Sequence, residues 1–212
     1  MVLDLIAKGG PVMWALLGAS IFSFSLIFYK FFYLIRLVFK YKYTHDFQKI
    51  CECIKNENFK DAKMLCLTPG PINKITHQGI KLLEQKHDKQ TIKDTLDLIY
   101  DDESSKLENG LSIILITGEI MPMLGLLGTI AGMIHVFDGI SIYATTNAQI
   151  MASGISEALI TTKTGLALAI PILFSYTVLS QFVDNISKKL RLVAGSILNL
   201  VNQNTTSFKT YV

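Results

Sequence analysis

Three long apolar stretches set the main constraint on how this chain can fold. They cover residues 11–37, 111–137 and 149–183. Each is long enough to cross a bilayer as an α-helix, which takes about 20 mostly apolar residues. The chain is 50% hydrophobic and only 17% charged, whereas a soluble domain carries about 25% charged residues. The sequence therefore predicts an all-α membrane protein with three transmembrane helices.

The first apolar stretch is predicted to be a retained membrane anchor and not a cleavable signal. The 18 residues from Val12 to Tyr29 carry no charge, and Lys8 is the only basic residue before them. No small-residue cleavage site interrupts the stretch, as a signal peptide would require.

Basic residues are distributed unequally around the apolar stretches. Lysines and arginines follow the first and third stretches, whereas the connection 138–148 contains none. Because positively charged residues are retained on the cytoplasmic side, we expect 1–10 and 138–148 to be periplasmic and 38–110 and 184–212 to be cytoplasmic. The third stretch is longer than a bilayer requires and is expected to continue as a cytoplasmic helix to about Val201.

The cytoplasmic region 38–110 is expected to form long helical extensions of the spans. It is charged but balanced, with 13 Lys or Arg and 12 Asp or Glu between Arg36 and Gly110. Residues 68–71 read Thr-Pro-Gly-Pro, a sequence that ends one helix and begins another. Apolar residues then recur at helical spacing, with no further proline before Pro122. This pattern predicts a cytoplasmic helix that runs into the second span without a stop.

Composition and motifs argue against several classes of function. Cys51, Cys53 and Cys66 are an odd number at irregular spacing, so we expect reduced cysteines and no disulfide framework. A metal site that also uses His45 and His77 is not expected, because residues two apart on a helix point to different faces. The net charge of +3 is too small to indicate a nucleic-acid partner. Neither a P-loop nor a nucleophile–base pair is present, so no enzyme activity, catalytic residue or cofactor is expected.

The second and third stretches contain polar and ionisable residues at positions where a membrane-spanning helix usually has apolar side chains. Glu157, Thr161 and Thr164 are spaced to share one helix face, which gives the third stretch a polar stripe. Lys163 lies beside this stripe, and Glu119 lies near the start of the second stretch. Ionisable groups at membrane depth are costly and usually face a cavity, a partner or an ion path.

Three sequence blocks give the chain a resemblance to a known family. They are residues 8–14 (KGGPVMW), 122–132 (PMLGLLGTIAG) and 154–171 (GISEALITTKTGLALAIP). With their order, and with a single span before the cytoplasmic region, they resemble the MotA/TolQ/ExbB proton-channel family, and specifically its three-span ExbB/TolQ branch. The flagellar MotA branch usually has two spans before that region and fits less well.

The resemblance implies a homo-oligomeric, pentameric ring in a bacterial inner membrane, with a pore lined by the second and third spans. Single-span ExbD/TolR-like partner helices, which carry a membrane aspartate, would sit inside the ring. Proton flow would move partner against ring. The motion would energise either a TonB-like protein for outer-membrane uptake or a TolA-like protein for outer-membrane maintenance. Both roles stay open, because they share all three blocks.

Thr129 and Thr162 match the family's pore threonines. A threonine hydroxyl can donate and accept a hydrogen bond and so relay a proton, but it can equally bond only its own i−4 carbonyl. Glu157 matches the family's acidic position near the outer end of the third span. If the two spans are antiparallel with the threonines level, His135 falls near Glu157. That pair could carry a proton or simply hold the ring together.

Lys163 departs from the family pattern. A lysine near the bilayer centre costs about 3 kcal/mol on insertion scales. It could pair with the partner's aspartate, snorkel toward an interface or bond carbonyls of a neighbouring copy. Glu119 could lie at the inner mouth of the pore or bridge to a neighbouring subunit. Thr161 and Thr164 are further candidates for the proton path.

A separate set of residues is predicted to pack or bend the helices. Glycines three or four apart allow helices to approach closely in lipid, and prolines inside spans can bend them. These residues are Gly125, Gly128, Gly132, Gly165, Pro122 and Pro171.

The motor subunit has one main competitor, a non-conducting membrane scaffold for an envelope complex. A secondary transporter is disfavoured, because three spans without an internal repeat do not readily form an alternating-access site.

Overall fold

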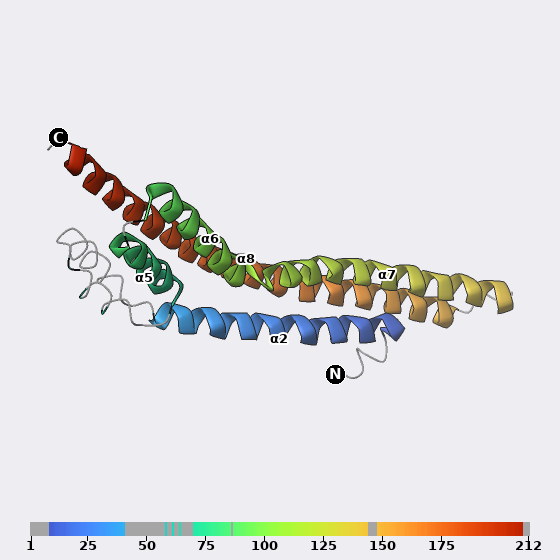
Figure 1. Cartoon of the computed structure of the whole chain (residues 1–212). Coiled ribbons are helices and arrows are strands. Elements are labelled where there is room, and N and C mark those ends of the chain that lie inside the picture. Colours follow the sequence, from blue (N-terminus) through green and yellow to red (C-terminus); the bar gives the residue numbers. More distant parts are fainter. Residues whose placement is uncertain are drawn as a thin grey trace. The chain divides into compact units, whose positions relative to one another are not determined.

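The computed structural model describes residues 9–40, 58, 61, 64, 70–85, 87–143 and 148–209. The elements in this part of the chain are all α-helices (Figure 1). They are α2 (Gly10–Lys40), α5 (Pro71–Glu84), α6 (Lys89–Glu108), α7 (Leu111–Tyr143) and α8 (Ala148–Lys209).

Three helical regions of the described chain are long and apolar enough to cross a membrane. They lie within Gly10–Leu37, Lys89–Ser141 and Met151–Asn199. The predicted all-α class and the three candidate spans are therefore confirmed, and the chain is a multi-pass membrane protein.

The helices divide between two compact units. The first unit contains α2 up to Phe31, α7, and α8 up to Leu179. The second contains the end of α2, α5, α6, and α8 from Ser180 onward. Helices α2 and α8 therefore each contribute to both units.

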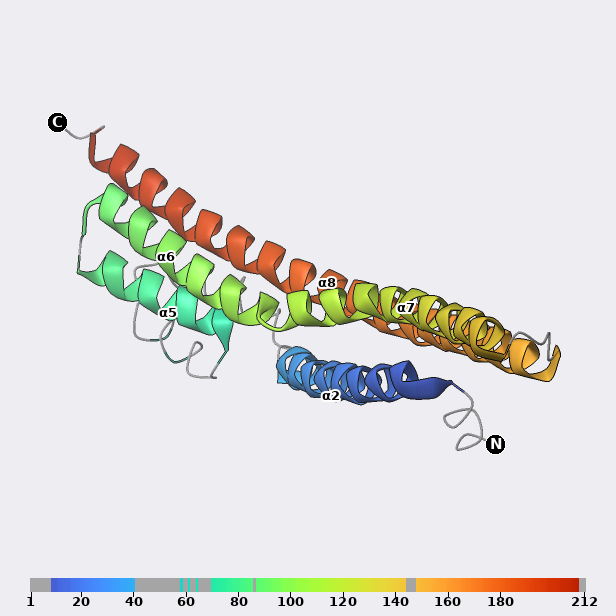
Figure 2. The same cartoon turned by 90° about the vertical axis from the view of Figure 1, so that its right-hand side faces the viewer.

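In the first unit α7 and α8 are antiparallel and lie side by side in both views (Figures 1 and 2). Both continue through an internal proline, Pro122 in α7 and Pro171 in α8. The hydroxyls of Ser20 and Ser23, which are buried on α2, donate to the Leu17 and Ala19 carbonyls of the same helix. Buried hydroxyls of this kind need such partners, because lipid supplies none.

The second unit packs like a water-soluble helical domain. Buried residues of α5 and α6 form its core, among them Ile75, Ile92 and Leu96. Gly79 lets α5 approach α8 closely, since a Cβ there would lie 2.8 Å from Ile197 Cδ1. Figure 2 shows α6 running beside this part of α8.

Helix α5 begins where the sequence predicts, with Gly70 as the N-cap and Pro71 in its first turn. The predicted run-on of α6 into the second span is wrong, because the helix is interrupted at Asn109 and Gly110. Gly110 adopts the left-handed φ of 84°, which glycine tolerates better than other residues. Helix α8 is longer than predicted and continues past Val201 to Lys209.

The predictions for the three cysteines and for His45 lie outside the described residues. His77 is exposed on α5. No group of three or more potential metal-binding side chains occurs among the residues that the structure describes.

A cluster of four charged side chains, of which three are exposed and Glu103 is mostly buried, joins α5 to α6. Lys74 Nζ donates to Glu103 Oε1 at 2.6 Å, and Lys106 Nζ donates to Asp102 Oδ2 at 2.6 Å. The hydrogen bond from Lys106 is the largest influence that lowers the pKa of Asp102. Reciprocally, the hydrogen bond to Asp102 raises the pKa of Lys106, and that to Glu103 raises the pKa of Lys74.

The signs of these shifts define the pH range in which the cluster stabilises the fold. A carboxylate with a lowered pKa stabilises above its ordinary value of 3.8 and loses that effect as pH falls through the folded value. A lysine with a raised pKa stabilises below its ordinary value of 10.5 and loses the effect as pH rises through the folded value. The contribution is therefore constant across the neutral range.

We predict that Asp102→Asn slightly lowers the hydrogen-exchange protection of α5 and α6. The effect is small because exposed ion pairs are weakened by solvent and salt. Its size should be constant from about pH 5 to about pH 9 and vanish as pH falls through the lowered pKa of Asp102. Asp97→Asn, at an exposed carboxylate outside the cluster on the same helix, is the control. An equal loss of protection in both variants would show that the charged cluster does not stabilise the contact between α5 and α6.

Candidate functional site

The backbones of α7 and α8 touch because glycines line the contact. A Cβ added at Gly125 would lie 3.1 Å from Thr162 Cα, and one at Gly165 would lie 2.6 Å from the carbonyl oxygen of Met121. One at Gly132 would lie 2.9 Å from the carbonyl of the opposing helix. In lipid, helices associate by this kind of close packing.

Thr162 uses the close approach to bond across the helix pair. Its Oγ1 donates to the carbonyl oxygen of Gly125 at 3.0 Å and also lies 3.3 Å from that of Ala158 in its own helix. The side chain is half-buried. The hydroxyl of Thr162 is therefore not limited to its own helix, unlike the common role of threonine in membrane helices.

The other candidate threonines bond within their own helices. Thr129 Oγ1 donates to the Leu126 carbonyl and Thr164 Oγ1 to the Ile160 carbonyl. Thr161 is fully buried, packs against Gly128 and donates to the Ala158 carbonyl.

Thr129 and Thr162 are not level, contrary to the assumption from sequence. Thr162 is level with Gly125, one turn before Thr129 on α7. The physical reason is that the glycine contacts set the register of the two helices, and Gly125 is the residue that opens its carbonyl to the opposing hydroxyl.

His135 and Glu157 lie together, although the two threonines whose equal depth that expectation assumed are not level. His135 Nδ1 on α7 is 3.9 Å from Glu157 Oε2 on α8. The imidazole is 61% exposed and the carboxylate only 21% exposed. Both groups can bind and release a proton, so this pair is the part of the site that can change its charge.

Glu157 also meets the start of α2, a contact that was not predicted from the sequence. Gly10 begins α2 with a left-handed φ of 65°, and a Cβ there would overlap Glu157 Oε1. The amides of a helix's first turn lack helical partners and carry partial positive charge, which favours a nearby carboxylate. The available signal was Gly10 directly before Pro11, since glycine permits a tight entry into a proline-initiated helix.

Glu119 and Lys163 lie apart from this cluster. Both side chains are exposed. Neither forms a hydrogen bond or ion pair within the described part of the chain. The structure therefore separates the sequence-predicted residues into an interhelical group around Thr162 and Glu157 and two outward-facing charges.

Comparison with known proteins shows that most of the chain, including α7, matches a known protein family. Residues 68–191 match the family described as the MotA/TolQ/ExbB proton channel family. The matched range contains α5, α6, α7 and most of α8, and therefore all the polar candidates on α7 and α8.

Individual relatives are similar over different shares of the chain. A putative biopolymer transport protein ExbB homolog of Methanothermobacter thermautotrophicus is 26% identical over 91% of this chain and 67% of its own length. Biopolymer transport protein exbB1 of Vibrio cholerae is 32% identical over 60% of this chain and 56% of its own length. The Tol-Pal system protein TolQ of Haemophilus influenzae is 36% identical over 44% of this chain and 41% of its own length. The matches thus span from about two fifths to two thirds of these relatives.

We predict that Gly165→Ala separates α7 from α8, because the new methyl group would press against the Met121 backbone. Overpacking of this kind costs about 1–3 kcal/mol, and should appear as a lower unfolding temperature of the purified protein in detergent. Gly18→Ala on α2 is the matched control, since no atom lies within 4 Å of a Cβ there. An unchanged unfolding temperature for Gly165→Ala would contradict the close backbone contact.

A second prediction concerns Gly10. Gly10→Ala should destabilise the fold for two reasons, the left-handed φ and the overlap with Glu157. Adding Glu157→Ala removes the overlap but not the backbone strain, so the double variant should recover part of the loss. A double-mutant cycle of unfolding free energies measures this coupling. Additive losses would show that Gly10 and Glu157 are not in contact.

Proposed function

Because the chain belongs to the MotA/TolQ/ExbB proton channel family, we propose that it is a subunit of a proton-driven motor in the bacterial inner membrane. Copies of the chain form a pentameric ring around an ExbD/TolR-like single-span partner, with periplasmic N-termini and cytoplasmic C-termini. Proton flow through the ring energises a TonB- or TolA-type envelope protein. Relatives named biopolymer transport proteins support the first role, and a relative named TolQ supports the second.

The observation that carries the proposal is the row of polar groups along the apolar α7–α8 pair. The Glu157–His135 pair lies on the same two helices as the hydrogen bond from Thr162 to Gly125. Placing such groups at membrane depth is costly, and a proton path is a function that requires them.

The carboxylate, the imidazole and the hydroxyls on α7 and α8 would have different roles in proton transfer. Glu157 and His135 can each take up a proton and release it again. Thr162 can accept a proton on its hydroxyl oxygen while donating its own to the next acceptor, so it carries no lasting charge. Thr129 and Thr164 have spare lone pairs and could hold water along the same path, whereas Thr161 is fully buried against α7.

We predict that Thr162→Val lowers proton flux through liposomes that contain the chain and its single-span partner. Valine keeps the shape of threonine but removes a hydrogen bond worth about 1 kcal/mol, so flux should fall about fivefold. Thr162→Ser should retain most of the flux. Thr177→Val is the control on the same helix, because Thr177 is exposed and bonds only the Leu173 carbonyl.

Glu157→Gln tests the titrating group, since glutamine keeps the size of the side chain but cannot exchange a proton. The motor proposal expects flux to fall in this variant with the oligomer intact. Unchanged flux in both Thr162→Val and Glu157→Gln would leave the alternative function, a non-conducting scaffold for an envelope complex.

A further inference from the structure

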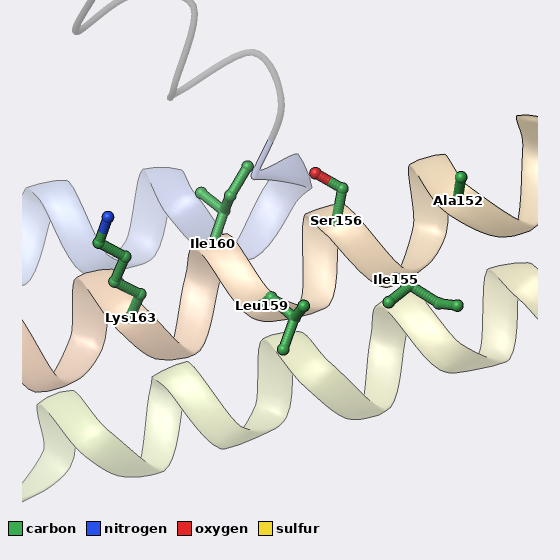
Figure 3. A pocket seen from close by; sticks show the side chains of 6 residues that line it. All are labelled: Ala152, Ile155, Ser156, Leu159, Ile160 and Lys163. Carbon is green, nitrogen blue, oxygen red and sulfur yellow. The ribbon is translucent and has the colours of Figure 1, made fainter.

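An open groove lies along one face of α8 in the first unit. It has a volume of about 500 Å³ and is lined by Ala152, Ile155, Ser156, Leu159, Ile160 and Lys163. Figure 3 shows that its polar side-chain atoms are Ser156 Oγ and Lys163 Nζ, which point to the same side of the helix. The groove is therefore apolar with one fixed positive charge.

The positive charge of Lys163 has no counterpart within the described part of the chain. Its side chain is exposed and forms no hydrogen bond or ion pair there. An ammonium group in the hydrocarbon region is costly unless an acid, a carbonyl or water covers it. A stable assembly therefore has to bring a polar group, preferably a carboxylate, to this groove.

Glu119 carries the opposite charge and, like Lys163, has no partner within the described part of the chain. The spans 111–137 and 149–183 contain four acidic, basic or imidazole side chains, namely Glu119, His135, Glu157 and Lys163. His135 and Glu157 lie together. The remaining two are one acid and one base, and both are exposed without a partner among the described residues.

The face of α7 that carries Glu119 has the shape and chemistry to fill the groove. Met123, Leu126 and Ile130 follow Glu119 at helical spacing, and they are 66%, 59% and 52% exposed. This face combines large apolar side chains with a single carboxylate, which complements an apolar groove with a single ammonium group. Lipid can cover the apolar side chains of this face, so it is the carboxylate at membrane depth that calls for a partner.

The depths of the two charges allow them to meet between copies. Thr162 bonds Gly125, so Lys163 lies close to the level of Gly125. Glu119 is six positions from Gly125, which is about 9 Å along the helix axis. Copies related by an axis normal to the membrane lie at equal depth. The side chains of Lys163 and Glu119 have to cross this offset together, because the four-carbon stem of lysine alone is shorter than about 9 Å.

We propose that α7 of a second copy of this chain occupies the groove on α8, with its Glu119 paired to Lys163. The interface would bury both charges against each other. This proposal rests on the homo-oligomeric assembly in the proposed function, but it does not depend on proton conduction. The ion pair is therefore tested by the yield of oligomer, whereas conduction is tested by proton flux, and either can fail without the other.

The test uses two opposite charge reversals, Glu119→Lys and Lys163→Glu, in the full-length chain. Each variant alone places like charges at every interface, and the yield of oligomer should fall about tenfold or more. When the two variants are co-expressed with different tags, the acid pair of one chain meets the basic pair of the other. In a pentamer at most four of the five interfaces then carry opposite charges, because two kinds of chain cannot alternate around an odd-numbered ring. Mixed oligomers should therefore be recovered in part by sequential purification on both tags.

Rescue by mixing separates this proposal from its alternatives. An ion pair within one chain would not be restored by mixing, because each chain would still carry two like charges. Lys188→Glu, at an exposed lysine of α8 in the second unit, is the control with the same change in charge. It should leave assembly unchanged.

Two results would overturn the proposal. In the first, Lys163→Glu assembles as well as the original chain. In the second, mixing fails to restore the oligomer although both variants retain their helical circular dichroism. If Lys163→Glu instead loses only a co-purified single-span partner and keeps its own oligomer, the groove belongs to that partner and the second-copy assignment is wrong.

Discussion

Close contact between the α7 and α8 backbones is the interaction on which the rest of the first unit depends. At Gly125 and Gly165 even one methyl group would meet backbone atoms of the opposing helix. In lipid there is little hydrophobic force between helices, so such contacts and the hydrogen bonds they allow hold the pair together. The bond from Thr162 to Gly125 exists because nothing larger than a hydrogen atom stands between them.

The same contact distributes the charges of the two spans. Once the glycines set the register, His135 falls beside Glu157, and Glu157 in turn meets the start of α2 at Gly10. Glu119 and Lys163 are left on exposed faces. The first two groups thus lie close to each other, whereas the other two are exposed without a partner among the described residues.

The second unit depends on different forces. Its helices bury a mixed aliphatic core that includes Ile75 and Leu96, and a charged cluster joins α5 to α6. In water, burial of such residues is the main source of stability, whereas exposed ion pairs contribute little.

The all-α class, the three candidate spans and the start of α5 at Pro71 could be predicted from the sequence. The closeness of His135 and Glu157 was also expected, but from a register that placed Thr129 level with Thr162. Hydropathy and helix-start signals depend on residues that are close in the sequence, so they can be interpreted without knowledge of the tertiary structure. The interruption at Gly110 was missed because Leu107 and Leu111 keep helical spacing across it. The structure was needed to show that Thr162 bonds Gly125, that Glu157 meets Gly10, and that Glu119 and Lys163 stay apart. These facts depend on the register and rotation of neighbouring helices, which glycine contacts set and no single helix encodes.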